Sequence, residues 1–252
     1  MPPTIFVIRH AQGEHNVKRR HHLRDPHLTE LGREQCRQLR STFPHHDEIS
    51  IVMASPLLRT IQTASFCLGP ALKKPEVPFL LIPTAQEIAN QPCDIGYPPE
   101  ELKPMVREML SKEDLEFDAE KIDFSLVEEG WNSKFVDIFF IAQQGIYEAS
   151  YPAVEARAAS LRAWLYQRPE KNIVLVSHGA FLHYFSEDWT AFDAAKGTAY
   201  ENCEFRKFEF SEDSSAHEAH VVDCGGGKVK QGRPEGVHAH VLKAIKQVEK
   251  NA

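Results

Sequence analysis

TIFVIRH, at residues 4–10, is an apolar run that ends in a guanidinium and an imidazole side chain. Two later stretches have the same form, IVMASPLLR at residues 51–59 and IVLVSHG at residues 173–179. Short apolar runs of this kind are typical of buried strands in a parallel sheet. Ligands of open α/β sheets bind at the carboxyl ends of the strands. We therefore expect four basic side chains to meet at one sheet edge: Arg9, His10, Arg59 and His178.

Two guanidinium groups and two imidazoles at one edge would form a pocket for a phosphate dianion. The neutral imidazole of His10 is a good nucleophile toward phosphorus, and nearby guanidinium charges lower its pKa because they disfavour the imidazolium form. Arg9 and Arg59 can bind phosphoryl oxygens and hold the phosphorus in line for attack. His178 offers a further donor to the transferring group. These residue types predict phosphoryl transfer through a phosphohistidine, without a glycine-rich phosphate loop.

Glu87 is the candidate proton donor for the leaving alkoxide. It closely follows the apolar run at 79–82 and lies in a polar stretch of sequence. A carboxyl group near a bound phosphate dianion has a raised pKa, as a general acid requires. Glu14 and Asp94 are the next candidates for this role.

Helix and strand signals alternate along most of the chain. Thr29 is expected to cap a helix at 29–42 that places Leu31, Gln35 and Leu39 on one face. Ser55 and Pro56 predict another helix start. The remaining predicted elements are helices at 152–168 and about 180–187, edge or antiparallel strands at 204–210 and 217–223, and a docking helix in the tail from Gly236.

Residues 95–150 interrupt this alternation with acidic, helix-prone pieces at 99–110 and 111–117. They also carry an aromatic cluster formed by Trp131, Phe135, Phe139 and Phe140. We interpret this segment as an insertion that forms a helical cap beside the site. The expected fold is therefore a single domain over residues 1–252, an α/β three-layer sandwich with a mainly parallel central sheet.

Composition narrows the class of protein. The net charge is −7, from 29 basic and 36 acidic residues, which argues against nucleic acid or an anionic membrane as a partner. The five cysteines are widely spaced and form no CxxC pair, so we expect no disulfide framework and no zinc site. No signal peptide is visible, and no apolar run approaches the roughly 20 residues of a membrane span. We therefore expect a cytoplasmic protein.

Four motifs resemble those of the histidine phosphatase superfamily, also called the phosphoglycerate-mutase-like family. They are RHAQGEHN at 9–16, LTELGREQ at 28–35, SPLLRTIQTA at 55–64 and VSHG at 176–179. The resemblance covers roughly residues 4–95 and 150–190. It implies a phosphorylated His10 and no metal or organic cofactor. It also implies roles for six further residues: a phosphate pocket from Arg9, Arg59 and His178, proton donation by Glu87, and substrate binding at Asn16 and Gly179.

The chain departs from the family pattern at several positions. Ala11 stands where the family usually has Gly, and Gly13 stands where a Ser or Thr hydroxyl often contacts phosphate. Ala180 follows His178-Gly179, which is tolerable if only backbone amides are used there. The Glu-Arg-His-Tyr-Gly motif of true mutases is absent, because Glu87 is followed by Ile-Ala-Asn-Gln.

We therefore expect a phosphatase that hydrolyses a small-molecule phosphate ester through a phosphohistidine on His10. The alternatives are a phosphomutase of the same fold and a catalytically inactive phosphate-binding protein. The histidines of the N-terminal loop are expected to line the rim of the site rather than bind a metal: His15, His21, His22 and His27. The physiological substrate and homodimer formation are left open.

Overall fold

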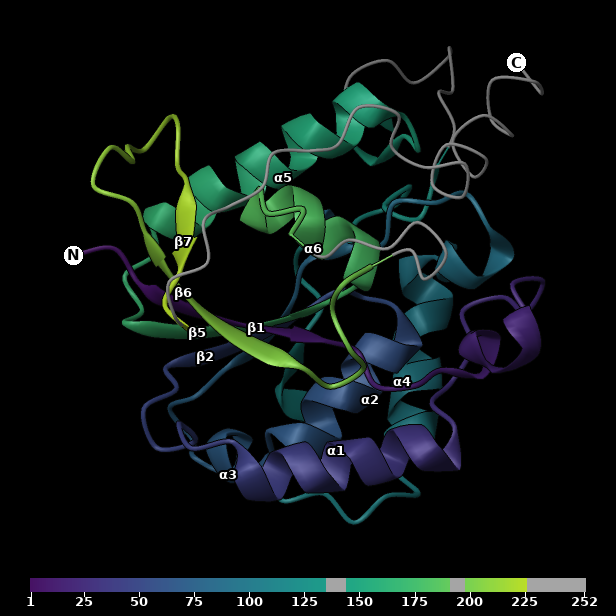
Figure 1. Cartoon of the computed structure of the whole chain (residues 1–252). Coiled ribbons are helices and arrows are strands. Elements are labelled where there is room, and N and C mark those ends of the chain that lie inside the picture. The colour runs from purple at the N-terminus through teal and green to yellow at the C-terminus, as the bar shows by residue number, and fades with distance from the viewer. Residues whose placement is uncertain (135–143, 191–197, 226–252) are drawn as a thin grey trace.

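A mixed seven-stranded sheet forms the centre of the protein, in a computed structural model that describes residues 1–134, 144–190 and 198–225 (Figure 1). The strand order is β4-β3-β2-β5-β1-β6-β7. Neighbouring strands from β4 through β1 run parallel, whereas β6 and β7 pair antiparallel. The strands are β1 (Thr4–Arg9), β2 (Ile51–Ala54), β3 (Phe79–Leu81), β4 (Ile122–Asp123), β5 (Asn172–Ser177), β6 (Phe205–Phe210) and β7 (Val221–Asp223).

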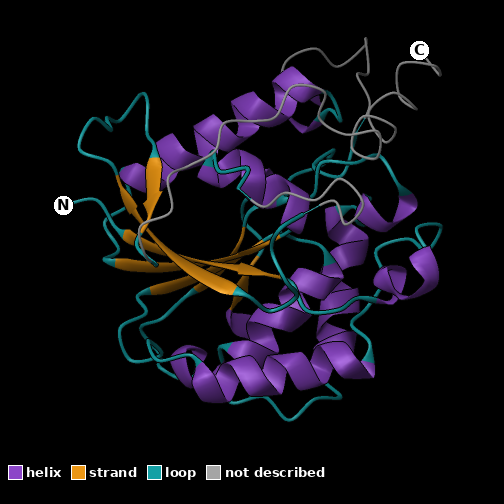
Figure 2. Ribbon diagram, in the orientation of Figure 1, coloured by secondary structure: helices purple, strands orange, loops and turns teal. Residues whose placement is uncertain are grey.

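Helices cover both faces of this sheet, so the protein has three layers (Figure 2). In Figure 1, α5 and α6 lie above the sheet, and α1 to α4 lie below it. Within the described residues, no helix is both long and apolar enough to cross a bilayer. The helices are α1 (Glu30–Thr42), α2 (Leu58–Cys67), α3 (Gly69–Leu72), α4 (Pro99–Leu110), α5 (Tyr151–Tyr166) and α6 (Gly179–Ser186).

Two hydrophobic cores hold the layers together, one on each sheet face. Phe6 and Ile8 of β1 belong to the core that includes residues of α1, α2 and α4. Ile5 and Val7 belong to the core that includes residues of α5 and α6. Because successive residues of a strand point to opposite faces, a strand that is covered on both sides is apolar throughout. This explains the uninterrupted apolar runs in the sequence.

The predicted α/β class and the main strands are confirmed, whereas the predicted start of the second helix and the predicted buried face of α1 are wrong. The second helix begins at Leu58 rather than at Ser55, whose hydroxyl lies 2.9 Å from Nε2 of His178. On α1, Leu31 is 54% exposed, and the buried face is formed by Gly32, Cys36 and Leu39. Thr29 caps α1 as predicted, since its hydroxyl accepts a hydrogen bond from Gly32 N at 3.0 Å.

The described part of the 95–150 segment contributes to the sheet layers. α4 packs into the lower core through Leu102 and Val106, and β4 extends the sheet in parallel beside β3. Trp131 is buried in the same core, whereas residues 111–117 form turns instead of helix. Three phenylalanines of the predicted aromatic cluster lie outside the described residues: Phe135, Phe139 and Phe140. The predicted tail helix lies outside them as well. The assignment of this segment as a cap insertion stays a prediction.

The sheet register brings the chemically interesting residues together. β5 lies between β1 and β2, with Arg9 opposite Ser177 and Ala54 opposite Val176. The loops that follow β1, β5 and β2 therefore begin at the same carboxyl edge of the sheet. α1 holds the loop that follows β1, because Gln12 O accepts a hydrogen bond from Thr29 N at 3.0 Å and lies against Gly32.

Gly32→Ala should destabilise the protein although alanine is the better helix former. Alanine is favoured over glycine by about 1 kcal/mol in an exposed helix interior. Here a Cβ would lie 2.2 Å from Gln12 O, so the loop or α1 must shift. We expect the free energy of unfolding, measured with urea, to fall by about 1–3 kcal/mol. Gln38→Ala on the exposed face of α1 is the control and should change it by less than about 0.5 kcal/mol. A stability equal to or above wild type for Gly32→Ala would contradict the close approach.

Candidate active site

His10 lies directly after β1 and is buried, with 2% of its surface exposed. Its Nδ1 lies 2.7 Å from the carbonyl oxygen of Ala11. A carbonyl oxygen only accepts hydrogen bonds, so Nδ1 carries the proton and Nε2 of the neutral ring carries the lone pair. The backbone therefore selects the tautomer in which Nε2 is the nucleophilic atom.

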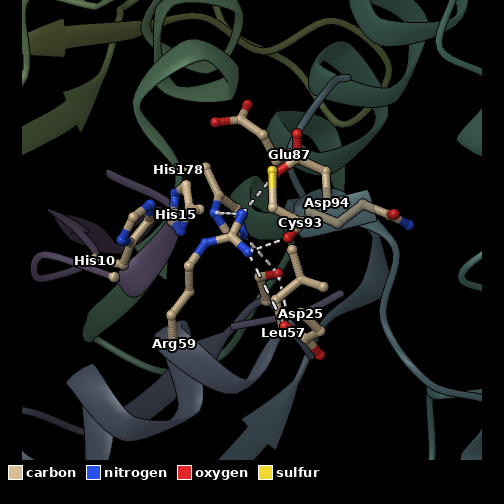
Figure 3. A network of polar contacts seen from close by, with 12 residues as sticks. His10, His15, Asp25, Leu57, Arg59, Glu87, Cys93, Asp94 and His178 are labelled. Carbon is tan, nitrogen blue, oxygen red and sulfur yellow. Dashed lines mark hydrogen bonds and ion pairs between the residues drawn. The ribbon is translucent and has the colours of Figure 1, made fainter. Parts of the chain in front are cut away.

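Arg59, in the first turn of α2, connects the other loops of this sheet edge (Figure 3). Its guanidinium is fully buried and donates from Nη1 to Cys93 O at 2.6 Å. Nη2 donates to Asp94 Oδ1 at 2.9 Å and to His178 Nδ1 at 3.1 Å. One side chain thus joins the loop after β3 to the loop after β5.

His178 receives the Arg59 hydrogen bond at Nδ1, which assigns the ring proton to Nε2. Nε2 then donates to the Ser55 hydroxyl at 2.9 Å. The ring centroid lies 5.2 Å from that of His10, so the two imidazoles are neighbours at the ends of β1 and β5. Because its two ring nitrogens form hydrogen bonds with Arg59 and Ser55, His178 holds the Arg59 guanidinium in position.

Arg9 brings a second guanidinium to the site and donates from Nη1 to Tyr200 O. Its Nε, like that of Arg59, is buried and has no hydrogen-bond partner among the described residues. A buried N–H donor without a partner costs free energy comparable to a lost hydrogen bond. The guanidinium charges of Arg59 and Arg9 both help to lower the pKa of His10. Two unpaired cationic donors beside the nucleophilic ring suit an anion.

Glu87 lies in the loop after β3, and backbone N–H groups hold its carboxylate. Oε1 accepts hydrogen bonds from Ile88 N at 3.0 Å and from Phe181 N in α6 at 3.1 Å. The buried Lys134 side chain donates from Nζ to the Glu87 carbonyl at 2.6 Å and holds the loop in place. Burial, with a contribution from the Asp94 carboxylate, raises the pKa of Glu87. This shift favours the protonated form that a general acid needs.

Three imidazoles of the site are held neutral. Burial, followed by the charge of Arg59, moves the pKa values of His10 and His178 well below their ordinary value. The same two causes, aided by His21, lower the pKa of His15 to about 2. A nucleophilic imidazole must be unprotonated, so this electrostatic environment keeps His10 in its reactive form.

Asn16 and Gly179, the two expected substrate-binding residues, occupy different surroundings. Asn16 is exposed, and its Oδ1 accepts a hydrogen bond from Gly13 N at 3.0 Å. Gly179 is buried at the first position of α6, where a Cβ would lie 2.7 Å from the Thr198 side chain. Gly179 therefore lets the His178 turn pack closely against Thr198.

Sequence reasoning missed the structural importance of Asp25 and underestimated that of His15. Asp25 is buried, accepts a hydrogen bond from Leu58 N at 3.0 Å at the start of α2, and lies 4.0 Å from Nη1 of Arg59. Burial raises its pKa to about 7. His15 is 6% exposed, and its ring lies 5.6 Å from that of His10. Gly13 makes room for it, since a Cβ there would lie 2.8 Å from the His15 ring.

The other loop histidines are more exposed than His15. His22 and His27 are exposed, and their expected place at the rim of the site stays a prediction. His21 is half-buried, with Nδ1 3.7 Å from the Cys93 sulfur. Burial raises the pKa of the Cys93 thiol, which makes it a poor nucleophile.

Comparison with known proteins assigns the family. The model of the histidine phosphatase superfamily, branch 1, matches residues 5–113 and 84–222, so the chain belongs to this superfamily. The chain is similar to a phosphoglycerate mutase-like protein of Arabidopsis thaliana, with 30% identity over 216 residues, 71% of this chain and 72% of that protein. Phosphoglycerate mutase-like protein 1 of the same plant is 28% identical over 204 residues, 72% of this chain and 70% of that protein.

Solved structures agree with this fold. YhfR of Bacillus stearothermophilus has a TM-score of 0.51 to this chain at 18% identity, covering 90% of this chain and 98% of that one. The match confirms the three-layer α/β architecture.

The buried neutral histidines should make the protein sensitive to acid. The unfolded chain binds a proton at each histidine below about pH 6.5, whereas the folded chain does not, so stability is present above that pH and is lost below it. His15→Asn should reduce this loss by about 2 kcal/mol between about pH 6.5 and about pH 5, at roughly 1.4 kcal/mol per pH unit. Urea unfolding at both pH values measures it.

His217→Asn changes an exposed histidine and is the matched control. It should leave the pH dependence as in wild type. An acid-induced loss in His15→Asn as large as in wild type would show that His15 protonates freely in the folded protein.

Proposed function

We propose that the protein hydrolyses phosphate monoesters of small molecules through a phosphohistidine on His10. The observation that carries the proposal is the position of His10 itself. Its Nδ1–H is held by the Ala11 carbonyl, which leaves the Nε2 lone pair for attack beside the unpaired Nε–H donors of Arg9 and Arg59. A neutral nucleophile next to unpaired cationic donors is the arrangement that phosphoryl transfer from a dianion requires.

In the first step, His10 Nε2 attacks the phosphorus and the bond from phosphorus to the ester oxygen breaks. The leaving alkoxide takes a proton from the Glu87 carboxyl group, whose raised pKa keeps a proton available. The new N–P bond places positive charge on the imidazole, and the hydrogen bond from Nδ1–H to Ala11 O stabilises that charge. Arg9 and Arg59 stabilise charge on the phosphoryl oxygens.

In the second step, water attacks the phosphorus of the phosphohistidine. The Glu87 carboxylate, now deprotonated, accepts a proton from the water, and the N–P bond breaks. Inorganic phosphate leaves, and His10 returns to its neutral form. The charges of the two arginines supply the electrostatic stabilisation, so we assign no step to a metal ion.

A phosphomutase is the second candidate, because the curated relatives are named phosphoglycerate mutase-like. A mutase would use the same phosphohistidine but pass the group to a substrate oxygen instead of water. The residues after Glu87 lack the mutase motif, and this favours hydrolysis. Release of inorganic phosphate without a second substrate separates the two activities.

His10→Ala should abolish turnover without unfolding the protein. A panel of phosphate esters, assayed in EDTA for release of inorganic phosphate, measures the loss. The control is His217→Ala, which removes an exposed histidine that has no part in the site and should keep wild-type activity. Hydrolysis by folded His10→Ala at the wild-type rate would rule out the mechanism. Activity that disappears in EDTA and returns with a divalent metal would also contradict it.

Glu87→Gln should matter in proportion to the leaving group. An alkyl alcohol is a poor leaving group that needs a proton, whereas p-nitrophenol is a good one that needs little help. General acid catalysis contributes about 10²–10⁴-fold, so phosphoenzyme formation should slow by about that factor on an alkyl ester and distinctly less on p-nitrophenyl phosphate. Single-turnover kinetics isolate this step, because the second step needs the carboxylate for both substrates.

Glu129→Gln, an exposed and otherwise comparable change, is the control and should leave both rates unchanged. Equal slowing of both esters by Glu87→Gln would show that another group protonates the leaving oxygen.

A further inference from the structure

Three cysteines from distant parts of the sequence meet on the α1 side of the sheet. Cys36 comes from α1, Cys67 is the last residue of α2, and Cys203 lies just before β6. Their sulfur atoms all lie within 4.8 Å of one another, and those of Cys36 and Cys203 are 3.9 Å apart. Among the described residues, this is the cluster whose side chains could converge on one metal ion. The proposed reaction uses none of these thiols.

The separation of the sulfur atoms fits a bound ion. A zinc–thiolate bond is about 2.3 Å long, so three thiolates around one ion lie about 4 Å apart. A disulfide instead needs sulfur atoms about 2 Å apart, and all three cysteines are free thiols in this structure. We propose that Cys36, Cys67 and Cys203 form a trithiolate site for one thiophilic divalent ion of the zinc type.

The charge around the cluster favours a divalent ion. Three thiolates and one divalent ion carry one net negative charge. The positive charge of the Arg9 guanidinium interacts with Cys203 and would stabilise that negative charge. A monovalent ion would leave a second negative charge in a buried place, which is costly.

The backbone prepares Cys203 for the role of a ligand. Cys203 adopts a φ of 59°, in the left-handed region that non-glycine residues seldom use. Its N–H donates to Arg9 O at 3.1 Å, which ties this conformation to the end of β1. Cys36 and Cys67 are fully buried, whereas Cys203 is half-buried. Non-glycine residues in unusual backbone regions often occur at ligand sites.

The test is titration of the reduced protein with Cd²⁺, followed by the ultraviolet charge-transfer band of sulfur bound to cadmium. This band reports thiolate ligands and is silent for ions on the histidine-rich loop. We expect saturation at one ion per chain in wild type. Cys203→Ala should lose the band, and since Cys203 is half-buried, circular dichroism should show that this variant remains folded. Folded Cys67→Ala protein should lose the charge-transfer band as well.

Two single-cysteine variants serve as controls. Cys224→Ala removes an exposed thiol, and Cys93→Ala removes the thiol next to His21. Both should keep the full band, and Zn²⁺ should raise the Tm of Cys224→Ala as in wild type but not that of Cys203→Ala. A band that survives in Cys203→Ala, a band lost with Cys93, or no saturable band in reduced wild type would overturn the proposal.

Discussion

The buried guanidinium of Arg59 is the constraint on which the site depends. It is fully buried and bonds to the Cys93 carbonyl, the Asp94 carboxylate and His178. A buried cation is tolerated only where hydrogen bonds and charges compensate for lost water. Those partners belong to loops after β3 and β5, so placing Arg59 also places the loops. Its charge then disfavours protonation of His10, which links the packing of α2 to the reactivity of the ring that directly follows β1.

The fold was predictable because the strands are buried on both faces. Apolar runs ending in chemically distinctive residues at 4–10, 51–59 and 173–179 identify the three adjacent central strands. The exact helix start at Leu58 was not predictable, because the Ser-Pro pair that usually signals a start is used otherwise. There Ser55 contacts His178, a tertiary contact that overrides the local signal. The strand β4 has two residues, too few for a periodic pattern.

The sequence predicted which residues gather at the sheet edge, but not how they contact one another. His10, Arg59 and His178 follow adjacent strands, and this can be inferred from order alone. The hydrogen bonds of His178 to Arg59 and Ser55 depend on side-chain geometry that no spacing reveals. The buried position of His15 depends on space left by Gly13, and the sequence pattern shows at this position only the loss of a hydroxyl group. Likewise, the spacing of Cys36, Cys67 and Cys203 in the sequence does not show that they meet. Their proximity depends on how α1, α2 and the chain before β6 pack together.

The proposed reaction depends on transfer of the phosphoryl group to Nε2 of His10. The most direct measurement is mass spectrometry of the enzyme quenched in base during turnover of p-nitrophenyl phosphate, with the phosphate located by peptide mapping. We expect one phosphoryl group per chain on His10, stable in base and lost in acid, as is typical of a phosphohistidine. Phosphate on another residue, or hydrolysis that proceeds with no phosphoenzyme in rapidly quenched samples, would rule out His10 as the nucleophile.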